Sequence, residues 1–284
     1  MDKPTLLEAQ QWASSCLNVK AATTAPDLPA TIMMDLFNWS RTQYLMRLRE
    51  HLTTKQWQAY QRVVTRIAAG EPEQYVIGTA QFYGHSFKVT PDVLIPRQET
   101  EELVDWVLSD HDETPQRVLD IGTGSGVLAI SLALNRPQWQ VTGTDISQAA
   151  VQVAQQNADQ FGVKIDWKIG DLYAPVAGER FDLIISNPPY ISEAERPLMD
   201  DNVLDYEPHQ ALFAAHNGLA LYERLAAGLA EHLTANGNAY FEIGFAQGAA
   251  VKRLFKAAMP MAEVTLKQDI NGHDRMIRVR LTRK

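Results

Sequence analysis

The sequence predicts an α/β fold: a doubly wound parallel sheet that ends in an antiparallel hairpin, preceded by a small helical domain. Up to about residue 70, apolar residues recur at helical spacing, whereas after Pro96 short apolar runs alternate with helical stretches. Near the C-terminus, two apolar runs lie close together on either side of Asn271-Gly272. A chain of 284 residues is long enough for two domains of ordinary size.

The N-terminal stretch has the pattern of several short helices. Thr53 and Thr54 offer an N-cap for a helix that ends near Gly70, the residue type expected just past a helix C-terminus. Earlier helices are expected around three groups of apolar residues: Leu6, Leu7 and Trp12; Leu36, Phe37 and Trp39; and Tyr44, Leu45, Leu48 and Leu52.

The pattern of apolar residues changes after Gln74, which divides the chain. The short runs Tyr75-Val76-Ile77 and Phe82 to Val89 are punctuated by Gly78 and Gly84, which predicts a β-hairpin. We therefore expect three segments: a helical domain over residues 1–72, a hairpin linker over 73–95 and a larger domain over 96–284.

In the larger domain, strands and helices alternate, as in a parallel sheet covered on both faces. Strands are expected at residues 117–121, 140–144, 165–169, 181–186 and 238–243, and helices at 127–134, 147–161 (capped by Ser147) and 219–233. Two last strands at 263–268 and 276–281 predict an antiparallel hairpin at the sheet edge. A parallel sheet closed in this way is similar to a class I methyltransferase domain.

Composition narrows the classes of function. Lys and Arg number 26 against 34 Asp and Glu, a formal charge of -8, which argues against a broad nucleic-acid surface. Apolar runs stay below the roughly 20 residues of a membrane helix. The single cysteine, Cys16, favours a reducing cytoplasm over a disulfide-linked secreted fold. The seven histidines lack metal-ligand spacing, so we predict that the protein uses no metal.

A glycine-rich loop follows the first strand of the larger domain: Asp120, Ile121, Gly122, Thr123, Gly124, Ser125 and Gly126. Glycines let a backbone turn tightly and approach a ligand, and the helix that follows presents unpaired N–H groups. A dinucleotide fingerprint would place its third small residue at position 127, which is Val127. The spacing therefore favours a nucleoside-thioether ligand.

Acidic residues after the next two strands suit the same ligand. Asp145 ends the second strand, where a carboxylate can accept hydrogen bonds from both ribose hydroxyls. Its alternative role is to cap the helix that begins at Ser147. Asp171 and Leu172 follow the third strand and would lie against adenine, although Leu172 could equally be ordinary core.

The tetrad Asn187, Pro188, Pro189 and Tyr190 follows the apolar strand over 181–186. Two prolines stiffen this loop and remove two N–H donors, so the loop presents acceptors to a ligand. The side-chain oxygen of Asn187 and the carbonyl of Pro188 could each accept one hydrogen of an NH₂ group, with Tyr190 packing on its plane. The alternative interpretation, a rigid turn after a strand, would explain Pro188 and Pro189 but not Asn187 before them and Tyr190 after them.

The tetrad and glycine loop resemble those of methyltransferases that modify planar NH₂ nitrogens with S-adenosyl-L-methionine. The whole chain is similar to the HemK/PrmC family of peptide chain release factor glutamine methyltransferases. Further stretches carry the resemblance: Tyr75 to Gly78, Phe82 to Gly84, Val93 to Glu101, Glu207-Pro208, Glu242 to Gly244 and Asp274-Arg275. Two positions depart from the family pattern: Gln98, usually proline, and Leu172, tryptophan in some relatives.

The resemblance implies a class I S-adenosylmethionine-dependent methyltransferase with a Rossmann-like sheet. Its expected reaction is N5-methylation of the glutamine in the Gly-Gly-Gln motif of class I release factors, which modulates translation termination, with S-adenosyl-L-homocysteine as the second product. Expected catalytic and substrate-binding residues are Asn187, Pro188, Pro189 and Tyr190, and expected cofactor-binding residues are Asp120, Gly122 to Gly126, Asp145, Asp171, Leu172 and Asn187. We expect a cytoplasmic monomer that binds neither nucleic acid nor a membrane.

Three alternatives remain open on the sequence. A glutamine methyltransferase of ribosomal proteins would use the same amide chemistry and the same tetrad. An N6-adenine DNA methyltransferase would use a similar tetrad on a flipped base, against which the net charge and the lack of a basic recognition domain argue. A non-catalytic S-adenosylmethionine-binding partner protein would not need the intact tetrad.

Overall fold

A computed structural model describes residues 3–18 and 27–281 of the chain. They divide into two compact units, residues 1–78 with 201–206 and residues 79–200 with 207–284. Parts of the predicted domains, residues 1–2, 19–26 and 282–284, lie outside the described residues. The predicted segment boundaries at 72 and 95 stay predictions.

The first unit is built from short helices around one apolar core. Trp12 and Trp57 meet edge to face with ring centroids 4.9 Å apart, and buried Tyr60 donates a hydrogen bond to the Pro29 carbonyl over 2.9 Å. The helices are α1 (Leu6–Asn18), α2 (Leu28–Phe37), α3 (Arg41–Met46), α4 (Thr54–Ala68), α5 (Glu73–Ile77) and α9 (Asp201–Tyr206).

Three local predictions in this unit can be compared with the structure. Thr53 caps α4 as expected, because its hydroxyl accepts the N–H of Gln56. The predicted strand at Tyr75-Val76-Ile77 is wrong, since these residues form α5, which ends at Gly78 in the left-handed conformation. Helical periodicity also fails after α3: Leu48 lies in a turn and Leu52 lies in the irregular segment before α4, where its N–H donates to the Pro4 carbonyl.

The second unit holds a two-stranded and a seven-stranded sheet. The strands are β1 (Thr79–Phe82), β2 (His85–Lys88), β3 (Arg117–Ile121), β4 (Gln140–Asp145), β5 (Asp166–Ile169), β6 (Phe181–Ser186), β7 (Leu233–Glu242), β8 (Glu263–Gln268) and β9 (Asp274–Arg280). The α-helices are α6 (Glu99–Asp110), α7 (Val127–Asn135), α8 (Gln148–Phe161), α10 (His209–Leu212), α11 (Ala215–Gly218), α12 (Ala220–His232) and α13 (Gly248–Ala258). Short 3-10 helices lie at Ala174–Val176 and Glu193–Leu198.

The large sheet has the strand order β5-β4-β3-β6-β7-β9-β8. β3 to β7 are parallel, and β9 pairs antiparallel with both β7 and β8. The predicted doubly wound sheet with an antiparallel hairpin at its edge is confirmed. The chain passes from β3 to β4 on one side of β3, and β6 later pairs on the other side of β3. The strand order therefore reverses at β3. In such sheets ligands bind at the carboxyl ends of the strands at this reversal.

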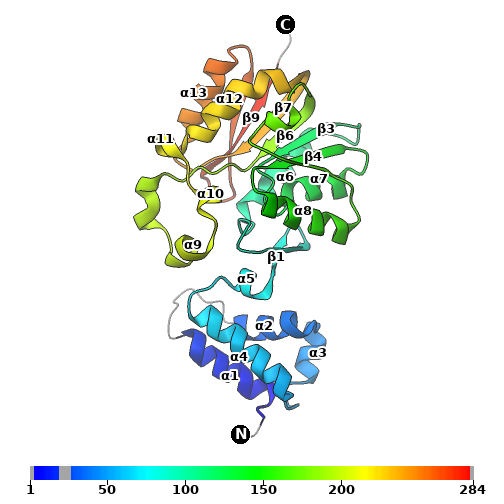
Figure 1. The fold of residues 1–284 in the computed structure, drawn as a ribbon, viewed down its shortest axis with the longest axis vertical. Helices are drawn as coiled ribbons and strands as arrows, with labels where there is room; N and C mark the ends of the chain where they lie inside the picture. The colour runs from blue at the N-terminus through cyan, green and yellow to red at the C-terminus, as the bar shows by residue number, and fades with distance from the viewer. Residues whose placement is uncertain (1–2, 19–26, 282–284) are drawn as a thin grey trace. The chain divides into compact units, whose positions relative to one another are not determined.

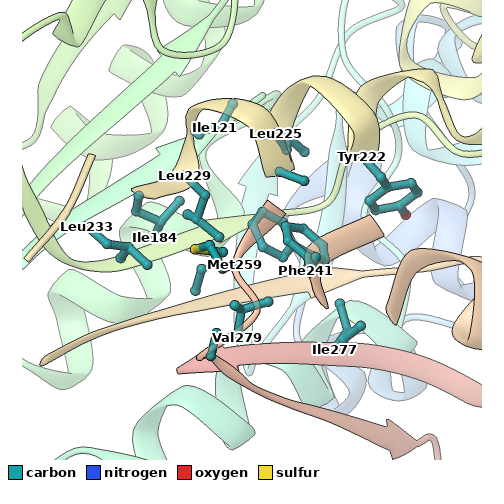
Figure 2. Close-up of a cluster of buried hydrophobic side chains, with 14 of the residues drawn as sticks. Ile121, Ile184, Tyr222, Leu225, Leu229, Leu233, Phe241, Met259, Ile277 and Val279 are labelled. Carbon is teal, nitrogen blue, oxygen red and sulfur yellow. The ribbon is translucent and has the colours of Figure 1, made fainter. Parts of the chain in front are cut away.

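Side-chain alternation along the strands builds a core on each face of the sheet. In β7, Tyr240 faces the layer of α6 and α7, whereas the next residue, Phe241, faces the layer of α12 and α13. Figure 1 shows these helices on the two sides of the sheet. In Figure 2, Leu225 and Leu229 of α12 point down onto Phe241.

The β1–β2 hairpin packs on the rest of the second unit. Phe82 and Phe87 are buried in the same core as α6 and α7. Asn157 of α8 accepts the N–H of Lys88 over 2.7 Å and donates to the carbonyls of Lys88 and Ser125 over 3.0 and 2.8 Å. One amide side chain therefore connects the hairpin to the glycine loop.

Leu229→Ala should lower the free energy of unfolding by about 2–5 kcal/mol, because Leu229 is fully buried under α12 and truncation leaves a cavity. Leu198→Ala is the matched control and should change stability by less than about 0.5 kcal/mol, since Leu198 is 86% exposed. Urea unfolding followed by fluorescence measures both variants. Equal effects would contradict the packing described for α12.

Candidate active site

A cavity of about 510 Å³ lies at the carboxyl ends of β3, β4 and β6. Its volume falls in the range of about 300–1,000 Å³ that small-molecule sites occupy. Its walls contain many of the predicted site residues: Gly122, Thr123, Gly124, Ser125, Asp145, Asp171, Leu172, Asn187 and Pro189. Among the residues that the structure describes, four other predicted members lie outside this lining: Asp120, Gly126, Pro188 and Tyr190.

The glycine loop is held in a conformation that needs glycine. Gly122, Gly124 and Gly126 have φ angles of 72°, 55° and 84°. A Cβ on Gly126 would lie 3.0 Å from Ile130 and 3.1 Å from Ala154, whereas a Cβ on Gly122 or Gly124 would meet no described atom within 4 Å. Gly126 therefore serves packing, and the other two leave the backbone accessible from the cavity.

Asp120 lies buried beneath the loop instead of facing the cavity. Its Oδ2 accepts the hydroxyl hydrogen of Thr123 over 2.6 Å. Burial raises the pKa of Asp120 to about 7, and the neighbouring Asp145 adds to the shift, while hydrogen bonds from Thr123 and the Ala129 N–H oppose it. Its contacts show Asp120 supporting the loop from below.

Asp145 shapes the turn beside the loop. Its two carboxylate oxygens accept the N–H groups of Gly124 and Ser147, each over 2.9 Å. Burial raises the pKa of Asp145, and these hydrogen bonds oppose the shift. The cap of α8 is Ser147 itself, as predicted, because its hydroxyl accepts the N–H of Ala150 over 3.2 Å. Asp145 thus supports the turn while lining the cavity.

Asp171 and Leu172 form the next part of the wall. Asp171 pairs with Arg224 of α12 over 2.6 Å, and both side chains are about half exposed. Leu172 has a φ of 48°, in a left-handed region that costs a non-glycine residue free energy. The fold holds Leu172 in this conformation beside the cavity, where it also packs against the core of Figure 2.

The tetrad leaves β6 beside the glycine loop. The Ser186 hydroxyl donates to the Ile121 carbonyl over 2.6 Å, which fixes the strand end, and the Asn187 Nδ2 donates to the Thr100 hydroxyl over 3.2 Å. Pro188 is buried. Tyr190 donates its hydroxyl hydrogen to Glu242 Oε1 over 3.2 Å, and its ring packs against the buried core.

Several residues outside the predicted list of site residues hold the tetrad. The Gln247 side chain donates to the Tyr190 carbonyl over 2.8 Å, and Glu242 and Thr100 lie behind the tetrad. Glu242 ends an apolar strand, and a carboxyl group in that position is a signal for a buried functional acid. Gln247 offers no comparable signal because its partner is distant in sequence.

Two ion-paired residues add to the cavity region. Arg97, which lines the cavity, pairs with Glu207 over 2.6 Å, and the Glu207 side chain is only 2% exposed. Glu207 also accepts the N–H of Ile95 over 3.3 Å. The segment before α6 is thereby tied to the segment before α10.

Comparisons with known proteins place the chain in a family. The family model "PrmC N-terminal domain" matches residues 8–78, and "Methyltransferase small domain" matches residues 100–204. A release factor glutamine methyltransferase from Enterococcus faecalis is 43% identical over 269 residues, covering 95% of this chain and 96% of the other. The chain belongs to the release factor glutamine methyltransferase family. A second family member, from Bacillus subtilis, is 39% identical over 280 residues, covering 96% of each chain.

The fold of this family member is also found in solved structures. A methyltransferase from Pyrococcus furiosus matches with a TM-score of 0.54 and 15% identity, covering 71% of this chain and 91% of that chain. At this identity the likeness concerns the fold alone. The predicted class I methyltransferase fold is confirmed.

Asp120→Asn should flatten the pH dependence of stability. Because the folded state raises the pKa of Asp120 from about 4 to about 7, folding favours the protonated form. The contribution of this group to the free energy of unfolding is therefore full below about pH 4, falls as the pH rises to about 7 and stays low above it.

Urea unfolding of the wild type and Asp120→Asn across this range measures the difference. The wild type should lose stability relative to the variant as the pH rises. A difference that is constant with pH would contradict the described environment of Asp120.

Proposed function

We propose that the protein transfers a methyl group from S-adenosyl-L-methionine to the N5 amide nitrogen of the glutamine in the Gly-Gly-Gln motif of class I peptide chain release factors, and so modulates translation termination. The observation that carries this proposal is Asn187, an amide acceptor at the end of β6, in the wall of the cavity that also contains the glycine loop and Asp145. The names of the relatives support the substrate.

The residues around the cavity fit S-adenosyl-L-methionine. Backbone at Gly122 and Gly124 is open toward a ligand, because a Cβ there would meet no described atom within 4 Å. We infer that Asp145 accepts ribose hydroxyls with its remaining lone pairs and that Leu172 lies against the adenine. When bound, the cofactor supplies an electrophilic methyl group on its sulfonium and becomes S-adenosyl-L-homocysteine.

The protein's task in this reaction is to orient a weak nucleophile. An amide nitrogen is a poor nucleophile because its lone pair is delocalised into the carbonyl. Asn187 Oδ1 and the Pro188 carbonyl would accept its two hydrogens, which directs the lone pair outward and favours the positive charge that develops on nitrogen. Asn187 is not a strong base, so orientation and electrostatics carry the catalysis. The N–C bond to the methyl group would form as the S–C bond of the cofactor breaks, and the nitrogen would release one proton through the tetrad acceptors or to water.

Further parts of the proposal concern partners and location. We propose that residues 1–72 dock the release factor, since the helical unit has a core of its own and matches the family's N-terminal domain. Action as a cytoplasmic monomer without metal, nucleic acid or membrane stays a prediction. Within residues 3–18 and 27–281, helices long and apolar enough to cross a bilayer are absent.

Asn187→Ala should lower kcat for methyl transfer by about 100-fold or more, because it removes one charge-stabilising acceptor at the reacting nitrogen. The Kd for S-adenosyl-L-methionine, measured by calorimetry, should rise by a much smaller factor than kcat falls, because the glycine loop and Asp145 also line the cavity. Asn236→Ala is the matched control. Asn236 is exposed and lies in the first half of β7, away from the carboxyl end of that strand. Full activity in Asn187→Ala with cofactor binding intact would contradict the role of Asn187.

The substrate is tested by incubation with radiolabelled S-adenosyl-L-methionine and a purified class I release factor. The wild-type release factor should acquire label, and one in which the glutamine of Gly-Gly-Gln is replaced by alanine should not. A ribosomal-protein mixture and duplex DNA serve as competing substrates. Equal labelling of both release factors, or preferred labelling of a competitor, would overturn the proposed substrate.

A further inference from the structure

A buried chain of hydrogen bonds runs behind the tetrad. Asn187 Nδ2 donates to Thr100 Oγ1 over 3.2 Å, and that hydroxyl donates to Glu242 Oε2 over 2.6 Å. Thr100 lies in the first turn of α6 and Glu242 is the last residue of β7, and the two residues are 3% and 1% exposed. Three elements that are far apart in sequence therefore meet at the Asn187 amide.

When Glu242 is ionised, the number of hydrogens in this chain allows one polarity. A carboxylate only accepts, so the single hydrogen of the Thr100 hydroxyl lies on the bond to Glu242. Thr100 then offers only lone pairs to Asn187, and the Asn187 group that faces it must be NH₂. The reverse orientation would place two acceptor oxygens against each other. The Asn187 Oδ1 is consequently turned away from Thr100.

Three neighbours of Glu242 favour its ionised, hydrogen-accepting form: Thr100, Tyr190 and Arg275. Tyr190 donates to its Oε1 over 3.2 Å, and Arg275 supplies a nearby positive charge, itself held by Asp269 over 3.1 Å. Burial raises the pKa of Glu242, with a small addition from Glu99, and Thr100, Arg275 and Tyr190 oppose the shift. The Tyr222 hydroxyl donates to the main-chain carbonyl of Glu242 over 2.6 Å, which holds the end of β7.

We propose that Thr100 and Glu242 are positioning residues that orient the Asn187 amide, so that its Oδ1 faces the substrate and selects a side chain that donates hydrogens. This inference rests on the proposed function, since it assigns the target amide as the donor. Thr100 also lines the cavity, but the role proposed for it is its hydrogen bond to Asn187: Glu242 acts on Thr100, and Thr100 acts on Asn187.

Thr100→Val tests the chain because valine keeps the shape of threonine and removes the hydroxyl. We expect kcat for release factor methylation to fall by about tenfold, the effect of one hydrogen bond, with the KM and Kd for S-adenosyl-L-methionine within about twofold of wild type. Thr100→Ser returns the hydroxyl and should recover most of kcat. Thr142→Val, a matched change at a buried threonine of β4 outside the described cavity lining, should leave kcat unchanged.

A double-variant cycle tests whether Glu242 acts through Thr100. Glu242→Gln replaces an obligate acceptor with an amide that can also donate, so the hydroxyl hydrogen loses its fixed direction. Adding Thr100→Val to Glu242→Gln should then cost less than about threefold in kcat, against about tenfold in the wild-type background. Independent, multiplying losses would overturn the relay, as would wild-type kcat in Thr100→Val or equal losses in Thr100→Val and Thr100→Ser.

A readout without turnover separates this inference from the proposed function. The side-chain NH₂ resonances of Asn187, assigned by their loss in Asn187→Asp, should move in Thr100→Val and return toward their wild-type positions in Thr100→Ser. Unmoved resonances would overturn the orientation of Asn187 whatever the substrate. A wild-type enzyme that does not methylate the release factor would overturn the proposed function alone.

Discussion

The reversal of strand order beside β3 is the constraint on which the site depends. Parallel strands place their carboxyl ends at one edge of the sheet. Because the chain leaves β3 and β6 towards opposite sides, a crevice opens between the loops that follow these two strands. The glycine loop, Asp145 and Asn187 all follow strands that end there, so chain segments distant in sequence line one cavity. The two cores on the faces of the sheet hold this edge in place.

Around that edge the protein stabilises loop conformations that are unfavourable in isolation. Three glycines with positive φ form the loop after β3, and Leu172 is held at a φ of 48°. Buried acids support these loops from behind: Asp120 beneath the glycine loop, and Glu242 behind the tetrad. Glu242 accepts hydrogens from Thr100 and Tyr190. Asp120, by contrast, accepts the Thr123 hydroxyl hydrogen through Oδ2, and its buried Oδ1 has no partner within hydrogen-bond geometry among the described residues. An unpaired buried charge is costly, and the raised pKa of Asp120 reflects that cost.

Local patterns predicted the second unit better than the first. The sheet was predicted correctly because the alternation of strands and helices is a signal carried by many residues. The cap at Ser147 was predicted correctly because it depends on residues close in sequence. The run Tyr75-Val76-Ile77 has strong β-propensity yet forms α5, because burial of Tyr75 in that helix outweighs a weak local preference. Likewise, the helical spacing of apolar residues continues to Leu48 and Leu52, although α3 ends before them. Residues of an irregular segment can pack against the core at the same spacing as those of a helix.

The tetrad, the glycine spacing and the family resemblance could be predicted from the order of residues alone, because each depends on neighbours a few positions apart. The sequence alone could not predict which of these residues face the cavity. Asp120 and Gly126 turn into the protein, and Tyr190 packs on the core with its hydroxyl on Glu242. Thr100 and Glu242 lie 142 positions apart, and only the packing of α6 against the end of β7 brings the hydroxyl to the carboxylate. Hydrogen-bond polarity at Asn187 is therefore a property of the tertiary structure, since it depends on partners that no local pattern connects.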